Sequence, residues 1–282
     1  MVYGKRGRKV YGWTVAEYAS LVRIFCSDSS EYEVFDAILK MAKSNLSWGD
    51  TEFYTGVSKR RILRFLLQKI TSREVDFDES VRWLPTERAL KNPGVTFLID
   101  HTNVKLKWKQ SNGPKARLYF NLKKGMSYKY FVACTVQQTP ISTSTAQPGR
   151  RHDFFHFVSP LRRHFINDFG LADGGYRGIG PHIRVPIRKP NKRKFTDEQN
   201  VANFKHSRVR SRIERCFGIV KRFKILRVTD LSPRVHELFF RLILVCEHKI
   251  RVARNVQCRT PYPSAEGPLD PGRECHCDWQ KL

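Results

Sequence analysis

Acidic residues are scarce in this sequence. Of its 282 residues, 26 are Asp or Glu and 52 are Lys or Arg, which gives a formal net charge of +26 and an isoelectric point near 10.1. A chain this cationic favours a polyanion as its partner, and nucleic acid is the commonest one. The alternative is a basic protein that binds acidic proteins or anionic membranes.

The sequence also lacks a long hydrophobic run. The longest apolar stretch, LFFRLILVCEHKI from Leu238, is interrupted by Arg241 and Glu247 and is too short to span a bilayer. The first residues, MVYGKRGRKVYGW, carry cations without the apolar segment of a secretory signal. We therefore expect neither a membrane span nor a membrane partner.

Cysteine offers no disulfide framework. The seven cysteines are odd in number and irregularly spaced, and most stand singly within apolar patterns, which favours a reduced, intracellular protein. Cys275-His276-Cys277 lacks a second ligand pair at the spacing of a zinc site. The 40% of hydrophobic and 12% of aromatic residues nevertheless suffice for a real core.

Residues 1–72 carry helical signals. Thr14 and Glu17 form a capping-box pair at the start of a helix expected over 14–26, and apolar spacing predicts another over 31–42. Gly56 ends a short helix, and Ser58 can cap the next one. This order is typical of a helix-turn-helix DNA-binding unit, and an ordinary helical hairpin is the alternative. The outward cations of the second helix would be Lys59, Arg60, Arg61 and Arg64.

The remainder of the chain changes character twice. Mixed charge and two prolines predict a linker over 73–94, and a Pro- and Gly-rich stretch without periodicity predicts a disordered tail over 258–282. Between them, residues 95–257 predict three strands and then alternating helices and strands, which is a mixed α/β domain. The expected strands cover 95–108, 116–124, 128–137, a short segment ending at 173, and 182–187; the expected helices begin at 152, 196 and 232.

Three carboxylates stand out in this second region. Asp100 and Asp173 end apolar strands, and Glu214 lies at the edge of the inward stripe of a basic helix. Carboxylates from two strand ends and one helix suit Mg²⁺ or Mn²⁺, and two such ions clamp the attacking and leaving oxygens of a phosphodiester. Glu214 is then tolerated among cations because all of them serve one substrate.

Each carboxylate also has a purely structural interpretation. Asp100 could accept a hydrogen bond from Thr102, and Asp173 could be a turn residue before two glycines. Glu214 could pair with Arg210, four residues earlier on the same helix. Spacing alone leaves both interpretations open.

Longer motifs add a family resemblance. The segments ADGGYRG and NFKHSRVRSRIERCFGIVKRFKIL, with FLIDHT and PGRRHD upstream, resemble the DDE-type transposases and endonucleases of the PIF/Harbinger superfamily. The resemblance implies an RNase H-like catalytic domain in which Asp100, Asp173 and Glu214 form the catalytic triad and bind two Mg²⁺ or Mn²⁺ ions. The implied activity is metal-dependent cleavage, and joining, of DNA strands at transposon ends.

One departure from the family pattern bears on activity. Where the family has Asp-Gly-Thr at its first acid, this chain has Asp100-His101-Thr102. His101 could bind metal or point to the other face of the strand. The alternatives are therefore a nuclease-inactive, domesticated DNA-binding protein and a basic RNA-associated protein. Asp153 is expected to cap a helix, with support of the metal site as the sharper alternative.

The expected partner is duplex DNA, in particular transposon terminal sequences. Beyond the first helical region, the predicted backbone contacts are Arg208, Arg210, Arg212 and Arg215. The resemblance adds a Myb-like accessory protein, and the sequence leaves a homodimer open. The clusters KRGRK and RKPNKRK resemble nuclear import signals and indicate the nucleus, with phosphate binding as their other use.

Overall fold

The structure, a computed structural model, covers most of the two expected regions. It describes residues 9–71, 97–107, 119–121, 125–136, 138–152, 170–179, 183–189 and 194–257. The linker expected over 73–94, the helix expected from His152, the cap expected at Asp153 and the tail 258–282 lie outside the described residues.

The N-terminal region is helical, as the periodicity predicts. A two-residue hairpin, β1 (Lys9–Val10) and β2 (Trp13–Thr14), leads into α1 (Val15–Phe25) and α2 (Ser29–Ser44). The predicted capping box is confirmed: the Glu17 amide donates to Thr14 Oγ1 at 3.2 Å, and the Thr14 amide donates to Glu17 Oε2 at 2.8 Å. These bonds satisfy two amides that the first helical turn leaves without partners.

Helices α3 (Trp48–Thr55) and α4 (Lys59–Thr71) follow the sequence signals closely. Gly56 ends α3 with φ of +69°, a left-handed conformation that glycine adopts without a Cβ clash. The Arg61 amide donates to Ser58 Oγ at 3.4 Å, so Ser58 caps α4 as expected. Ile62, Phe65, Leu66 and Ile70 form the buried face of α4.

The second region is built on a mixed sheet. Its strand order is β4-β5-β3-β8-β9; β6 and β7 also pair with β5, and β10 pairs with β3. Strand β3 is antiparallel to β5 and parallel to β8 and β10, and β8 is parallel to β9. The mixed α/β prediction is confirmed. The bounds are β3 Phe97–Leu106, β4 Phe120–Asn121, β5 Gly125–Thr135, β6 Pro140–Thr143, β7 Gln147–Pro148, β8 Gly170–Leu171, β9 Ile183–Arg184 and β10 Val228–Thr229.

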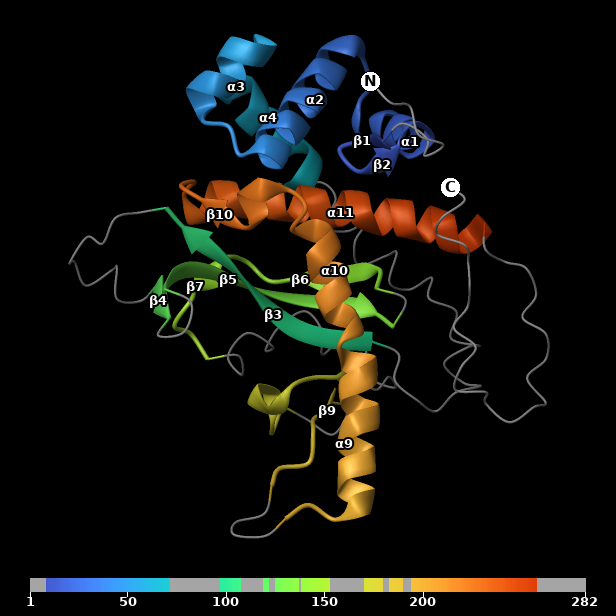
Figure 1. The fold of residues 1–282 in the computed structure, drawn as a ribbon. Coiled ribbons are helices and arrows are strands. Elements are labelled where there is room, and N and C mark those ends of the chain that lie inside the picture. Colours follow the sequence, from blue (N-terminus) through green and yellow to red (C-terminus); the bar gives the residue numbers. More distant parts are fainter. Residues whose placement is uncertain are drawn as a thin grey trace, which may run out of the picture.

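Helices α10 (Arg212–Val220) and α11 (Pro233–Gln257) of the second region pack on one face of this sheet, and α9 (Asp197–Arg210) extends beyond it (Figure 1). The long helix expected from 196 is two helices, α9 and α10, and the last helix is α11. Leu98 of β3 and Cys134 of β5 contact the buried side of α10. On the same face, the core that includes α11 contains Val104, Leu106, Tyr128, Tyr130 and Val132. Figure 1 shows α10 crossing the sheet and α11 running above it.

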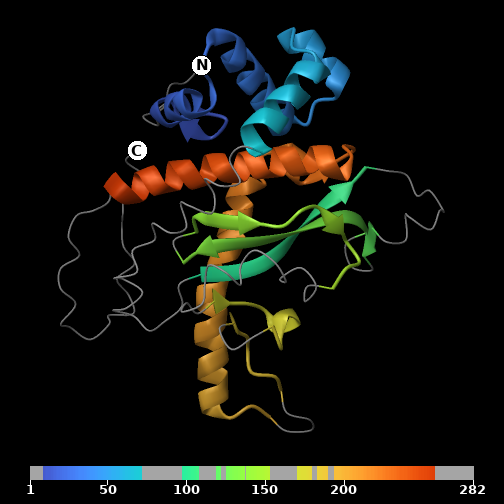
Figure 2. The same cartoon turned by 180° about the vertical axis from the view of Figure 1, so that it is seen from behind.

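Helix α11 lies between the sheet and the N-terminal helices, as both views show (Figures 1 and 2). Buried residues of α1, α2, α4, α11, β3 and β5 form one continuous hydrophobic cluster. Tyr130 of β5 stacks on Phe240 of α11 with ring centroids 4.0 Å apart, and Trp48 contacts Phe239 at 6.3 Å. The two regions therefore share a core instead of meeting at a polar boundary.

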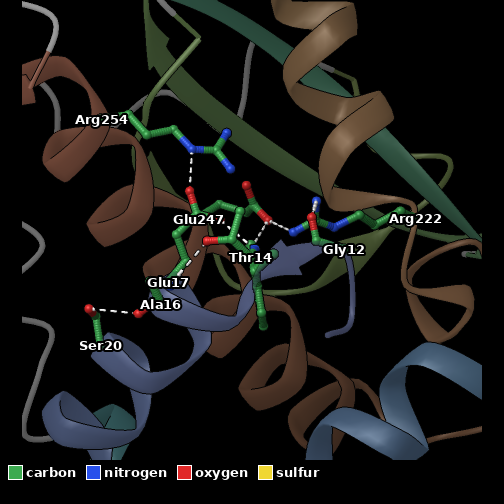
Figure 3. A network of polar contacts seen from close by, with 9 residues as sticks. Gly12, Thr14, Ala16, Glu17, Ser20, Arg222, Glu247 and Arg254 are labelled. Carbon is green, nitrogen blue, oxygen red and sulfur yellow. Dashed lines mark hydrogen bonds and ion pairs between the residues drawn. The ribbon is translucent and has the colours of Figure 1, made fainter. Parts of the chain in front are cut away.

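A buried polar network adds to this junction (Figure 3). Trp13, fully buried, donates from Nε1 to Glu247 Oε1 on α11 at 2.8 Å. Arg222, just after α10, pairs with the same carboxylate and donates to the Gly12 carbonyl oxygen at 3.1 Å. On the rim, Arg254 Nε lies 2.5 Å from Glu17 Oε1. One carboxylate thus links the N-terminal hairpin to the end of α10.

Within the described ranges, no helix combines the length and apolarity that crossing a bilayer requires.

Candidate active site

Asp100 lies in β3 on the face that carries α10. Leu98, two residues earlier, contacts Ile213 and Cys216 of α10 within one buried cluster. Because side chains two residues apart in a strand share a face, Asp100 points toward the same helix. Its side chain is 19% exposed, and its Oδ1 accepts a hydrogen bond from the His101 amide at 2.7 Å. The contact with Thr102 considered from the sequence is replaced by this one.

Asp173 reaches the same level of the sheet from β8. The parallel register pairs Leu98 with Leu171, and Asp173 keeps extended backbone angles of −77° and 176°. Strand β8 ends at Leu171, which packs with Leu98 under α10, and Ala172 points into the cluster on the other face. By this alternation, Asp173 is on the same face as Leu171. Asp173 also caps the 3₁₀ turn Gly174–Tyr176, because its Oδ1 accepts from the Gly175 amide at 2.8 Å. This contact confirms the turn role considered from the sequence, and it is compatible with a metal-binding role.

Glu214 comes from the first turn of α10. The buried stripe predicted from the sequence is present: Ile213, Cys216 and Val220 are buried. Glu214 sits beside Ile213 at the edge of this stripe, and its side chain is 64% exposed. Glu214 therefore lies near Asp100 on the face of the sheet that carries α10. The grouping of both with Asp173 stays a prediction.

Arg210 connects two of these carboxylates. Its Nη1 lies 3.1 Å from Asp100 Oδ2, and its Nη2 lies 3.6 Å from Glu214 Oε1. The pairing of Glu214 with Arg210 that helical spacing suggested is therefore present. No local pattern indicates the contact with Asp100, because 110 positions separate the two residues.

His101 points away from the carboxylates. Its ring is 9% exposed and lies on the opposite face of β3. It stacks on Tyr176 with centroids 5.3 Å apart, meets Phe131 edge-on at 5.7 Å, and hydrogen-bonds the Tyr176 hydroxyl through Nδ1. Of the two orientations open from the sequence, the structure has the one that takes the imidazole into the core.

The predicted DNA contacts of α4 divide into two groups. Lys59, Arg60 and Arg64 are exposed, and together with Leu63 and Leu67 they line an open hollow of about 570 Å³. Arg61 instead turns toward α2, where its Nη2 lies 3.3 Å from Ser30 Oγ and 3.8 Å from Glu33 Oε2. The outward set on this helix is thus smaller than the sequence suggests.

The predicted DNA contacts near α10 also differ from one another. Arg208, Arg212 and Arg215 are exposed and carry positive charge around the start of α10. Arg210 is the exception, since its guanidinium is 22% exposed and turned toward Asp100. His206, at the edge of α9, contacts the Arg184 carbonyl oxygen through Nε2 at 3.2 Å.

The carboxylates suit a hard divalent cation by chemistry. Asp and Glu oxygens are the ligands that Mg²⁺ and Mn²⁺ prefer, and Asp100, Asp173 and Glu214 reach one side of the sheet from separate elements. In the described part of the chain, no three acidic, histidine or cysteine side chains lie close enough together to hold a metal ion. Arg210 occupies the position between Asp100 and Glu214.

Comparison with known proteins identifies the family. The model of the DDE superfamily endonucleases matches residues 99–246, which is more than half of the chain and includes all three carboxylates. The chain therefore belongs to the DDE superfamily endonuclease family. Neither the curated proteins nor the solved structures contain a match to it.

Proposed function

We propose that this protein is a metal-dependent DNA endonuclease of the PIF/Harbinger transposase type. Membership of the DDE endonuclease family supports a nuclease in general. The arrangement that carries the proposal is Asp100 on β3, Asp173 two residues beyond the parallel strand β8, and Glu214 on the helix that packs against both strands. The strand order, with an antiparallel unit extended on one side by β8 and β9, supports an RNase H-like domain.

The proposed roles of the residues follow from their positions. Asp100, Asp173 and Glu214 would hold one or two Mg²⁺ or Mn²⁺ ions. When bound, such ions supply Lewis-acid stabilisation of the attacking and leaving oxygens of a phosphodiester. Arg208, Arg212 and Arg215 would contact DNA phosphates beside the carboxylates, and the exposed cations of α4 would hold duplex DNA at a second place.

The placement of His101 favours the active enzyme over the domesticated binding protein. The departure from Gly raised the prospect of a disturbed metal site, yet the imidazole packs against Phe131 and Tyr176 on the far face. The substitution therefore leaves the side of β3 with Asp100 unobstructed. The alternative that the test must exclude is a protein that binds DNA but does not cleave it.

The first test of this function is plasmid nicking with Mg²⁺ or Mn²⁺. We expect nicking by the wild type, with Asp173→Asn and Glu214→Gln slower by on the order of a hundredfold or more, because each removes a charged oxygen from the transition-state environment. Asp197→Asn is the matched control, since Asp197 is exposed in the first turn of α9. Tight DNA binding without nicking by the wild type would instead identify a nuclease-inactive protein.

Partners and location are part of the same proposal. The substrate would be duplex DNA with transposon terminal sequences, a Myb-like protein would assist binding, and a homodimer would bring two ends together. The nuclear location is supported by the basic clusters KRGRK and RKPNKRK. Fluorescence microscopy of a tagged chain with either cluster neutralised tests the location directly.

A further inference from the structure

Arg210 has an unusual position among the basic residues near the candidate active site. One guanidinium contacts two different carboxylates with two different nitrogens, Asp100 at 3.1 Å and Glu214 at 3.6 Å. Both carboxylates belong to the proposed metal-binding set. The exposed cations Arg208, Arg212 and Arg215 on the same helices have no carboxylate contact of this kind among the described ion pairs.

Electrostatics explains why a cation is needed here. Asp100 and Glu214 bring two negative charges toward one point, and Asp100 is largely withdrawn from water. Like charges in such a site repel, and a partly desolvated carboxylate is destabilised without a counter-charge. Arginine keeps its charge at any physiological pH and presents a planar fork of donors that can serve two carboxylates at once.

The surrounding structure allows this side chain to leave. Arg210 is the last residue of α9, a helix without a buried residue, and Ser211 separates it from α10. Glu214, by contrast, is on α10, which Ile213 and Cys216 anchor to the sheet. A rotation of the Arg210 side chain would therefore break both ion pairs while β3 and α10 stay in place.

We propose that Arg210 is the resident counter-ion of the active site, and that a divalent cation displaces it from Asp100 and Glu214. The inference rests on the proposed function, because it assigns metal binding to these carboxylates. Arg210 competes with the metal for the same oxygens. In the metal-free protein it links Asp100 on β3 to Glu214 on α10. When the metal binds, its guanidinium moves out of the site.

The test compares Mn²⁺ affinity of Arg210→Met and wild type by calorimetric titration without DNA. Removing a competitor should strengthen binding by roughly threefold or more, in line with the coupling of partly exposed ion pairs. Arg212→Met is the matched control: it removes the same charge from an exposed position two residues along. It should change the affinity clearly less than Arg210→Met does.

A second readout is the rise in melting temperature on adding Mn²⁺. Metal-free Arg210→Met leaves Asp100 and Glu214 without their shared cation, so it should melt below wild type and gain more from saturating Mn²⁺. A residue with a merely structural role would lower both melting temperatures equally. Equal Mn²⁺ affinity of Arg210→Met and Arg212→Met would overturn the inference and leave the nuclease proposal standing. Failure of every variant, wild type included, to bind Mn²⁺ would overturn both.

Discussion

Asp100 and His101 are neighbours in β3 whose side chains lie in opposite environments. Asp100 faces α10 and Arg210, while His101 is enclosed by Phe131 and Tyr176. The two-residue period of a strand produces this separation, because adjacent side chains point to opposite faces. His101, next to the proposed metal ligand Asp100 in the sequence, therefore has a packing role in the fold.

This assignment predicts a change in stability without a change in chemistry. His101→Ala should lower the free energy of unfolding by about 2–3 kcal/mol, because it removes ring contacts and a buried hydrogen bond. Nicking by the folded fraction should remain at the wild-type rate. Urea unfolding and nicking on the same samples measure both quantities.

Tyr176→Phe provides the graded control for this prediction. It keeps the ring and removes only the hydroxyl that bonds His101, so the expected loss is about 1 kcal/mol. A variant His101→Ala with normal stability and abolished Mn²⁺ binding would show that the imidazole serves the metal site after all.

At the scale of elements, α11 contains two buried histidines. His236 bonds the Tyr130 hydroxyl through Nδ1 at 2.6 Å and the Ile225 carbonyl oxygen through Nε2 at 3.0 Å. His248 donates from Nδ1 to the Pro140 carbonyl oxygen at 2.6 Å. Burial lowers the pKa of each imidazole to about 4, although the carbonyl contacts act in the opposite direction.

These pKa values predict acid destabilisation between pH 6.5 and 4. In this window the unfolded chain binds a proton at each histidine and the folded chain does not, so stability falls as the pH falls. From pH 6.5 to pH 5 the expected loss is on the order of 2 kcal/mol for each histidine. Urea unfolding at several pH values measures it.

Replacing one histidine isolates its share of this pH dependence. His236→Gln is expected to be less stable than wild type at pH 7, because it disturbs the contacts with Tyr130 and Ile225. Its stability should also fall less steeply with acid. An unchanged slope would mean that His236 is already protonated in the folded protein.

The elements also show what sequence reasoning can reach. Helix ends with local signals, such as the Thr14–Glu17 box and Gly56, lie where they were predicted, because the causes are within a few residues. Five short strands were missed, namely β1, β2, β6, β7 and β10. Segments of two to four residues show almost no period, and their pairing depends on the partner strand. The break between α9 and α10 at Ser211 was also missed, because a single continuous helix was predicted from Thr196.

The candidate site divides along the same line. Strand ends and helical spacing predicted Asp100, Asp173 and Glu214. The structure links Asp100 and Glu214 through Arg210, and the metal-binding role of all three stays a prediction. The contact of Arg210 with Asp100 could not be predicted, because it requires the packing of α10 on β3. The orientation of His101 was left open until the register of β3 and β5 was known.

At the scale of the whole molecule, one carboxylate joins the two regions. Glu247 is 2% exposed and accepts a hydrogen bond from the Trp13 indole. It also forms an ion pair with Arg222 (Figure 3). Burial lowers the pKa of Arg222, and the Glu247 charge acts against that shift. Removing either partner alone is therefore destabilising, because it leaves the other as an uncompensated charge inside the core.

Glu247→Ala should lower the free energy of unfolding by about 3–5 kcal/mol, the usual cost of leaving one buried charge without its partner. Urea unfolding of the variant and of wild type measures this difference.

Because the N-terminal helices and the sheet share one core, we also expect wild type to unfold in a single cooperative transition. Far-ultraviolet circular dichroism and tryptophan fluorescence should give the same midpoint. Two separate transitions would show that the helical region is an independent unit.

The position of α11 has a consequence for how the chain is made. Helices α1 to α4 leave the ribosome before α11 (residues 233–257), yet part of the core that they require is provided by α11. Trp13 and Glu247 are 234 positions apart. Until α11 is synthesised, the N-terminal helices therefore lack part of their packing partner, and their apolar surface is open to aggregation.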